Sequence, residues 1–117
     1  MLDFLLDILR FNSTSGSENE LAMYISDKYK PKNSSSEIQV TEKGRLNVFF
    51  KYGEPKIVFC SHLDTVPPYF NYRKNGDVIS GRGTCDAKGQ LAYLFEVYKQ
   101  LIEEGYCNIG MLMTCGE

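Results

Sequence analysis

The sequence predicts an α/β fold in which helices flank a mixed, largely parallel β-sheet. Two short apolar runs, residues 57–60 and 109–114, are separated by a helical pattern over residues 87–104. Such a strand, helix and strand unit pairs its two strands in parallel through a right-handed crossover. Two further runs, residues 37–40 and 47–52, alternate around a turn and predict a β-hairpin at one edge of the sheet. Together these elements fill one small domain over residues 1–117.

Two amphipathic helices are expected before the sheet. The first covers residues 1–9, where Asp3 and Asp7 interrupt the apolar run and no basic region precedes it, unlike a targeting segment. The second runs from the capping-box pair Ser17 and Glu20 to about residue 29. No stretch approaches the roughly twenty consecutive apolar residues of a membrane span. We therefore expect a cytoplasmic protein without a membrane partner.

The crossover unit has the clearest patterns in the chain. Apolar side chains recur at helical spacing at Leu91, Leu94, Phe95, Tyr98, Leu101 and Ile102. Gly105 can stop this helix. The run over residues 57–60 has the length and β-branched content of a buried strand, and we place it at the centre of the sheet.

Composition excludes some classes of partner. The net charge of −2 and the absence of a long basic run give no electrostatic basis for binding nucleic acid. The four cysteines lack the spacing of a structural zinc site and favour reduced thiols. Cys85 and Cys115 adjoin the candidate site described next, either as small buried apolar residues, the favoured reading, or as thiols beside a metal.

Half of a metal site is indicated where the strand over residues 57–60 ends. His62, the sole histidine, follows that strand, and Asp64 lies two residues on. Side chains two apart on an extended segment point the same way, so Asp64 can bond the second ring nitrogen of His62 and fix its tautomer. A structural, hydrogen-bonded histidine is the alternative.

A glycine-rich tract, residues 81–89, supplies a second candidate ligand. Its glycines allow tight turns around Asp86, which stands just before the helical pattern. Asp86 is either a helix cap or a carboxylate placed for coordination. Because ligands bind beyond the carboxyl ends of parallel strands, His62, Asp64, Asp86 and Glu117 are expected on one rim of the sheet.

These tracts resemble the zinc-dependent amidohydrolase and exopeptidase family that includes acetylornithine deacetylase, succinyl-diaminopimelate desuccinylase, aminoacylase and glutamate carboxypeptidase. The resemblance is carried by Ser-His-Leu-Asp-Thr-Val-Pro-Pro (61–68), Gly-Arg-Gly-Thr-Cys-Asp-Ala-Lys-Gly (81–89) and Leu-Met-Thr-Cys-Gly-Glu (112–117). The Ser/Gly-rich tract at residues 12–18 is also similar to the turn between the first two helices of that family.

The resemblance implies a two-metal zinc site, in which cobalt is also possible. It implies that His62 binds one metal, that Asp86 bridges two and that Glu117 is a general base, with Asp64 beside His62. It further implies a cis peptide bond between Asp86 and Ala87. Ala87 stands where many relatives have a bulkier residue, a change expected to alter packing more than coordination.

The implied reaction is hydrolysis of an amide bond, releasing an amino acid from an N-acyl group or a terminal peptide bond. The substrate is then a small N-acyl amino acid or peptide, and the resemblance allows a homodimer of the full-length protein. The second glutamate of the family's Glu-Glu pair and the more distant ligands are not in this sequence. We therefore expect an incomplete catalytic domain, inactive by itself. The alternative is a non-catalytic remnant of the fold that acts as an interaction or assembly module.

Overall fold

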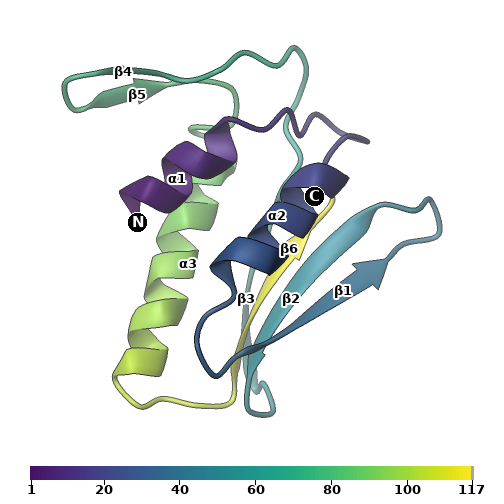
Figure 1. The fold of residues 1–117 in the computed structure, drawn as a ribbon, viewed down its shortest axis with the longest axis vertical. Coiled ribbons are helices and arrows are strands. Elements are labelled where there is room, and N and C mark those ends of the chain that lie inside the picture. Colours follow the sequence, from purple (N-terminus) through teal and green to yellow (C-terminus); the bar gives the residue numbers. More distant parts are fainter. Residues whose placement is uncertain (117) are drawn as a thin grey trace.

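The computed structural model describes residues 1–116, which form a four-stranded sheet, a two-stranded hairpin and three helices (Figure 1). The helices are α1 (Leu2–Leu9), α2 (Asn19–Tyr29) and α3 (Lys88–Glu103). The strands are β1 (Ser35–Val40), β2 (Leu46–Tyr52), β3 (Ile57–His62), β4 (Arg73–Asn75), β5 (Val78–Ser80) and β6 (Ile109–Thr114). Each helix and strand that the sequence predicts is therefore present, with small shifts at its ends.

The four-stranded sheet is mixed, as predicted, with its strands in the order β1, β2, β6, β3. β3 and β6 pair in parallel, from Ile57 opposite Ile109 to His62 opposite Thr114, which confirms the crossover unit. The β1/β2 and β2/β6 pairs are antiparallel. The prediction that the sheet is largely parallel is therefore corrected for the described strands. The apolar pattern of a strand does not specify the direction of the strand beside it.

β3 lies at an edge of this sheet, and β6 takes the inner position. Ile57 and Val58 are 61% and 42% exposed, so the prediction of a buried central strand is wrong for the described chain. An apolar, β-branched run reports a preference for the pleated conformation. It does not report how many strands pair with that run.

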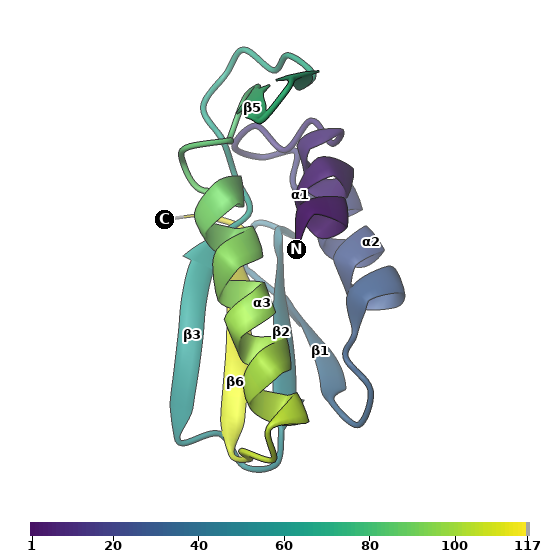
Figure 2. The ribbon, with the colours of Figure 1, turned by 90° about the vertical axis from the view of Figure 1, so that its left-hand side faces the viewer.

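All three helices pack on one face of the four-stranded sheet (Figures 1 and 2). Strands β2 and β6 supply alternate side chains to this face, so that Val48 opposes Met113 and Phe50 opposes Met111, all four buried. The helices add Phe4, Ile8, Leu21, Ile25, Leu91, Phe95 and Tyr98 to the same core. No helix among the described residues is long and apolar enough to cross a membrane.

The turn between α1 and α2 is held by other segments rather than by a capping box. Helix α2 begins at Asn19, and its N-cap residue, Glu18, makes no side-chain capping hydrogen bond. The Glu18 carboxylate instead accepts the Gly16 N–H at 2.7 Å and pairs with Arg45. The predicted pair of Ser17 and Glu20 is therefore wrong as the helix start, because long-range contacts fix the turn.

The same turn runs alongside the segment that follows β3. Thr14 and Thr65 form a parallel bridge, in which Ser15 N donates to Thr65 O at 3.1 Å and Thr65 N donates to Ser13 O at 2.9 Å. The buried Ser13 hydroxyl donates to Leu63 O at 2.8 Å. The chain after His62 is thus fixed by a segment some fifty residues earlier in the sequence.

Sequence reasoning missed the hairpin of β4 and β5. Its two strands pair antiparallel, from Arg73 opposite Ser80 to Asn75 opposite Val78. The hairpin projects beyond the α1 end of the molecule (Figure 1). Strands of three residues are too short to show a period of two, which is why the alternation signal was absent.

A single carboxylate joins α1 to α2. Asp7 accepts hydrogen bonds from the Tyr24 hydroxyl at 3.0 Å, from Lys28 Nζ at 2.9 Å and from the Tyr29 hydroxyl. These bonds, those of Tyr29 and Lys28 first, lower the pKa of Asp7 from 3.8 to about 2 against the opposing effect of burial. The charged carboxylate is therefore the form that the folded chain prefers.

Replacing this carboxylate by Asp7→Asn is expected to lower the free energy of unfolding by about 1 to 2 kcal/mol at neutral pH. Because the folded pKa is depressed, the stabilisation is present above pH 3.8 and is lost as the pH falls toward 2. Urea unfolding of both proteins from pH 7 to pH 2 measures this difference. Asp3→Asn on the same helix is the control, and equal pH dependence in the Asp7→Asn and wild-type proteins would contradict the assignment.

Candidate metal centre

The end of β3 presents His62 and Asp64 to the rim of the sheet. Their side chains are 16% and 14% exposed. His62 Nδ1 lies 2.9 Å from Asp64 Oδ1 and 3.0 Å from the Asp64 backbone oxygen. Both oxygens are acceptors, so Nδ1 carries a proton and donates to them. The predicted contact between the two residues is confirmed.

Asp86 reaches the same rim from the glycine-rich turn before α3. Its Oδ1 atom lies 3.1 Å from His62 Nε2, and its side chain is 70% exposed. The Asp86–Ala87 peptide bond is cis, as the family resemblance implies. A Cβ atom on Gly89 would lie only 2.3 Å from Thr84 O, so the close approach of this turn to the helix start requires glycine.

The surroundings of His62 favour a positive charge. Burial is the largest single influence on its pKa and lowers it. The hydrogen bonds to the backbone and carboxylate of Asp64, together with that to Asp86, outweigh burial, and the net result is a raised pKa. The rim is therefore suited either to an imidazolium or to a bound cation.

The donor atoms of His62 and Asp86 fit a metal ion. In the neutral imidazole with Nδ1 protonated, Nε2 presents a lone pair toward Asp86. Two donors on one tetrahedral zinc ion lie about 3.3 to 3.6 Å apart, close to the 3.1 Å between Nε2 and Oδ1. Within residues 1–116, no three His, Cys, Asp or Glu side chains are grouped to hold a metal, so these two residues are a partial ligand set.

Ser15 is a member of the site that sequence reasoning did not single out. Its hydroxyl donates to Asp64 Oδ2 at 2.7 Å, while Oδ1 of the same carboxylate faces His62. Each oxygen of Asp64 thus has its own partner, which fixes the plane of the carboxylate. No local signal could have found this contact, because 49 residues separate the two side chains.

Lys88 is a second residue that the sequence did not bring forward. It is 1% exposed, and its Nζ donates to the Phe11 backbone oxygen at 2.8 Å. Burial lowers its pKa to about 8. The side chain spans from the start of α3 to the turn after α1, and Gly83, with φ of +92°, passes close to its Cδ and Cγ atoms. Lys88 therefore ties the turn that carries Asp86 to the first helix.

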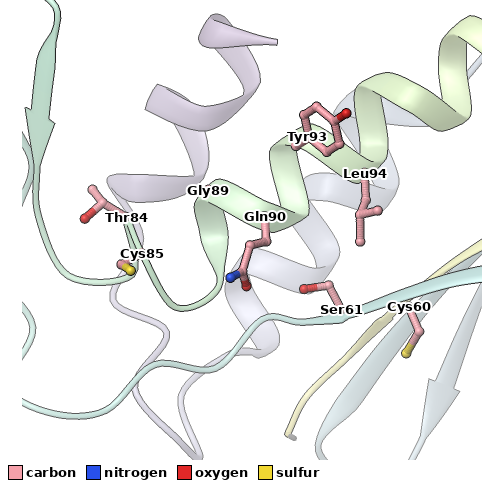
Figure 3. Close-up of a pocket in the computed structure, with 8 residues that line it drawn as sticks. All are labelled: Cys60, Ser61, Thr84, Cys85, Gly89, Gln90, Tyr93 and Leu94. Carbon is pink, nitrogen blue, oxygen red and sulfur yellow. The ribbon is translucent and has the colours of Figure 1, made fainter.

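A groove of about 660 Å³ lies between α3 and the end of β3 (Figure 3). Its lining residues are Cys60, Ser61, Thr84, Cys85, Gly89, Gln90, Tyr93 and Leu94. All four cysteines are free, and Cys85 is exposed whereas Cys115 is buried. The prediction that both are small buried residues is thus confirmed for Cys115 and wrong for Cys85. Cys85 lies on the groove beside Asp86.

Glu117, the predicted general base, lies outside the described residues. The residues that lead to it are described: Thr114 ends β6 opposite His62, and Leu63 N donates to Thr114 O at 2.7 Å. The chain therefore reaches the same rim at Gly116. His62, Asp64 and Asp86 are brought together as predicted.

Comparison with known proteins decides the family of this chain. The sequence model of peptidase family M20/M25/M40 matches residues 58–117, which include both the histidine tract and the glycine-rich tract. The chain belongs to this family. The match is consistent with the resemblance on which the expected ligands rest.

Relatives in this family are similar along the whole chain. A probable carboxypeptidase of Aspergillus clavatus is 34% identical over 134 aligned residues, covering 100% of this chain and 32% of the relative. A peptidase M20 domain-containing protein of Schizosaccharomyces pombe is 31% identical, covering 94% of this chain and 30% of the relative. The chain thus spans about a third of the length of these relatives.

Solved structures share the fold at lower identity. The M20 family metallo-carboxypeptidase of Sulfolobus solfataricus matches 96% of this chain with a TM-score of 0.75 and 20% identity, over 29% of its own length. The aminoacylhistidine dipeptidase of Vibrio alginolyticus matches 98% with a TM-score of 0.64 and 19% identity, over 27% of its length. The arrangement of helices and strands is therefore that of M20 structures.

Gly89→Ala tests the close approach that places Asp86. The added methyl group would meet Thr84 O, so we expect the turn to shift and the free energy of unfolding to fall by about 1 to 3 kcal/mol. The nitrogen NMR shifts of the His62 imidazole should change with it. Gln90→Ala, an exposed change at the next helix position, is the control and is expected to stay within about 0.5 kcal/mol. Unchanged His62 shifts in Gly89→Ala would contradict this role of the glycine.

Proposed function

We propose that this chain is part of a metal-dependent amide hydrolase that releases an amino acid from an N-acyl group or a terminal peptide bond. The observation that carries the proposal is the meeting of His62, Asp64 and Asp86 at one rim. A histidine fixed by a carboxylate, with a second carboxylate at ligand distance, is the arrangement of a metal ligand set. Membership of the M20 family supports the reaction class.

His62 through Nε2 and Asp86 through Oδ1 would hold the metal. Zinc suits one imidazole and one carboxylate donor, and cobalt accepts the same ligands. When bound, zinc lowers the pKa of water toward 7 and polarises a carbonyl group. Asp86 is proposed to bridge two such ions in the complete protein, with the other ligands supplied by residues beyond this chain.

Two carboxylates of this chain have separate proposed roles in the reaction. Asp64 keeps the proton of His62 on Nδ1 and so holds the imidazole in one orientation. Glu117 is proposed to take a proton from the attacking water and then to deliver it to the leaving amine, the two tasks of a positioned general base and acid.

The proposed substrate is a small N-acyl amino acid or peptide. The relative from Aspergillus clavatus is described as a probable carboxypeptidase, and one solved neighbour as an aminoacylhistidine dipeptidase, which supports a substrate cleaved near an end. A cytoplasmic location and a homodimer of the full-length protein stay predictions. Sedimentation of the full-length gene product tests the dimer.

Asp64→Asn is expected to retain metal and to lower the rate of hydrolysis about 10- to 100-fold. The amide keeps the size of the carboxylate but does not stabilise the required tautomer and charge of His62. The metal content, measured by emission spectrometry, should therefore stay unchanged while the hydrolysis rate falls. Asp77→Asn on the exposed hairpin is the matched control. Complete loss of metal from Asp64→Asn would make Asp64 a direct ligand instead.

Glu117→Gln tests the proposed reaction. In the full-length gene product with added zinc or cobalt, this change is expected to lower hydrolysis of N-acetyl amino acids or dipeptides about 10² to 10⁴-fold while leaving metal bound. The 117-residue chain alone is expected to show no turnover, since this sequence lacks the second glutamate and the more distant ligands that the family resemblance implies. Unimpaired turnover by Glu117→Gln would refute its role. A full-length product that hydrolyses nothing with either metal would favour the non-catalytic remnant.

A further inference from the structure

Glu18 is a carboxylate that the folded chain buries completely. Its Oε2 atom accepts the Gly16 N–H at 2.7 Å, and its Oε1 atom lies 2.5 Å from Arg45 Nε. Removing a charge from water is costly, and apolar residues in place of a buried ion pair are often as stable or more so. Stability alone therefore does not explain an ion pair at this position.

Arg45 connects Glu18 to the end of β6. While Nε faces Glu18, Nη2 of the same guanidinium donates to the backbone oxygen of Cys115. The planar, forked guanidinium can make both contacts at once, which the single ammonium group of lysine cannot reproduce. The same Nη2 atom also lies against Gly116, 3.4 Å from where a Cβ atom would stand.

The N–H of Cys115 is held from the same side. It donates to Asn47 Oδ1 at 2.8 Å. Asn19, at the start of α2, makes two further hydrogen bonds to the β1–β2 hairpin, in which Asn47 lies. Side chains from the beginning of β2 and the residue before it thus bind both backbone groups of Cys115. A strand end usually frays, but this one is fixed immediately before Glu117.

We propose that Glu18, acting through Arg45, is a positioning residue for the general base, because it fixes the backbone at Cys115 and Gly116, the two residues that precede Glu117. This inference rests on the proposed role of Glu117 as general base. A general base must lie within hydrogen-bond reach of the proton it takes, and a misplacement of about 1 Å can cost about 100-fold in rate. Buried Glu18 and its partly buried partner Arg45 supply that restraint from the turn between α1 and α2.

Arg45→Lys in the full-length gene product is the first test. Lysine keeps the charge but not the fork, so we expect kcat per bound metal to fall about 10- to 100-fold with KM and metal content nearly unchanged. Glu18→Gln, which keeps the shape of the side chain, should shift kcat in the same direction. A merely structural role would lower the folded fraction and leave kcat per metal-loaded molecule unchanged.

The matched control is an ion pair within the β1–β2 hairpin. Lys51 Nζ lies 2.9 Å from Glu37 Oε2 on the exposed surface, and neither residue contacts the end of β6 in the structure described. Lys51→Arg and Glu37→Gln alter another pair of a carboxylate and a cation, one that joins β1 to β2. Both are expected to leave kcat, KM and metal content unchanged.

A second readout does not depend on activity. The Cys115 thiol is buried, whereas Cys60, Cys85 and Cys107 are exposed and serve as internal references. Loss of one restraining hydrogen bond should raise the rate of maleimide labelling at Cys115 about tenfold in Arg45→Lys, with the reference rates unchanged. Tandem mass spectrometry resolves the four thiols, because fragmentation distinguishes Cys107 from Cys115, which share one tryptic peptide.

The two proposals fail in different ways. A wild-type protein that binds metal but hydrolyses nothing overturns the proposed function. The labelling of Cys115 still decides whether Arg45 restrains the backbone at Cys115 and Gly116. Labelling and kcat both within about twofold of wild type in Arg45→Lys would overturn the positioning role. Increased labelling with unchanged kcat would overturn it as well, because Arg45 would then restrain the backbone at Cys115 without any effect on catalysis by Glu117.

Discussion

The backbone pairing between the turn after α1 and the segment after β3 is the contact on which the candidate centre depends. Thr14 bridges Thr65, and hydrogen bonds from Ser13 and Ser15 hold the chain on both sides of Asp64. Beyond Leu63, whose N–H donates to Thr114 O on β6, this pairing holds the backbone at Thr65. The orientation of His62 at the rim follows from it, because Asp64 is the group that holds the ring.

Two buried charges join that turn to the other segments of the site. Lys88 donates to Phe11 O and brings the start of α3 to the turn. Glu18 pairs with Arg45 and brings in the hairpin and the end of β6. Each charge is buried only because a polar partner satisfies it, so the segments cannot move apart without exposing an unpaired group. The turn between two helices is in this way the common support of segments that are distant in sequence.

The fold tolerates extensive change of sequence. The M20 metallo-carboxypeptidase of Sulfolobus solfataricus is 20% identical and still matches with a TM-score of 0.75. A parallel pair such as β3 and β6 places its carboxyl ends on one edge whatever the core side chains are. The candidate centre also requires the short spacing from His62 to Asp64 and the glycines around Asp86. These local features set side-chain contacts that the arrangement of the strands alone does not set.

The sequence by itself determined the helices, the main strands, the crossover unit and the contact of His62 with Asp64. These depend on local periodicity or on side chains two residues apart, and both are visible along the chain. Only the tertiary structure decided that β3 lies at an edge and that Ser15 and Arg45 support the site. Those facts depend on which distant segments meet, and no local pattern records that choice because many pairings satisfy the same hydrophobic alternation.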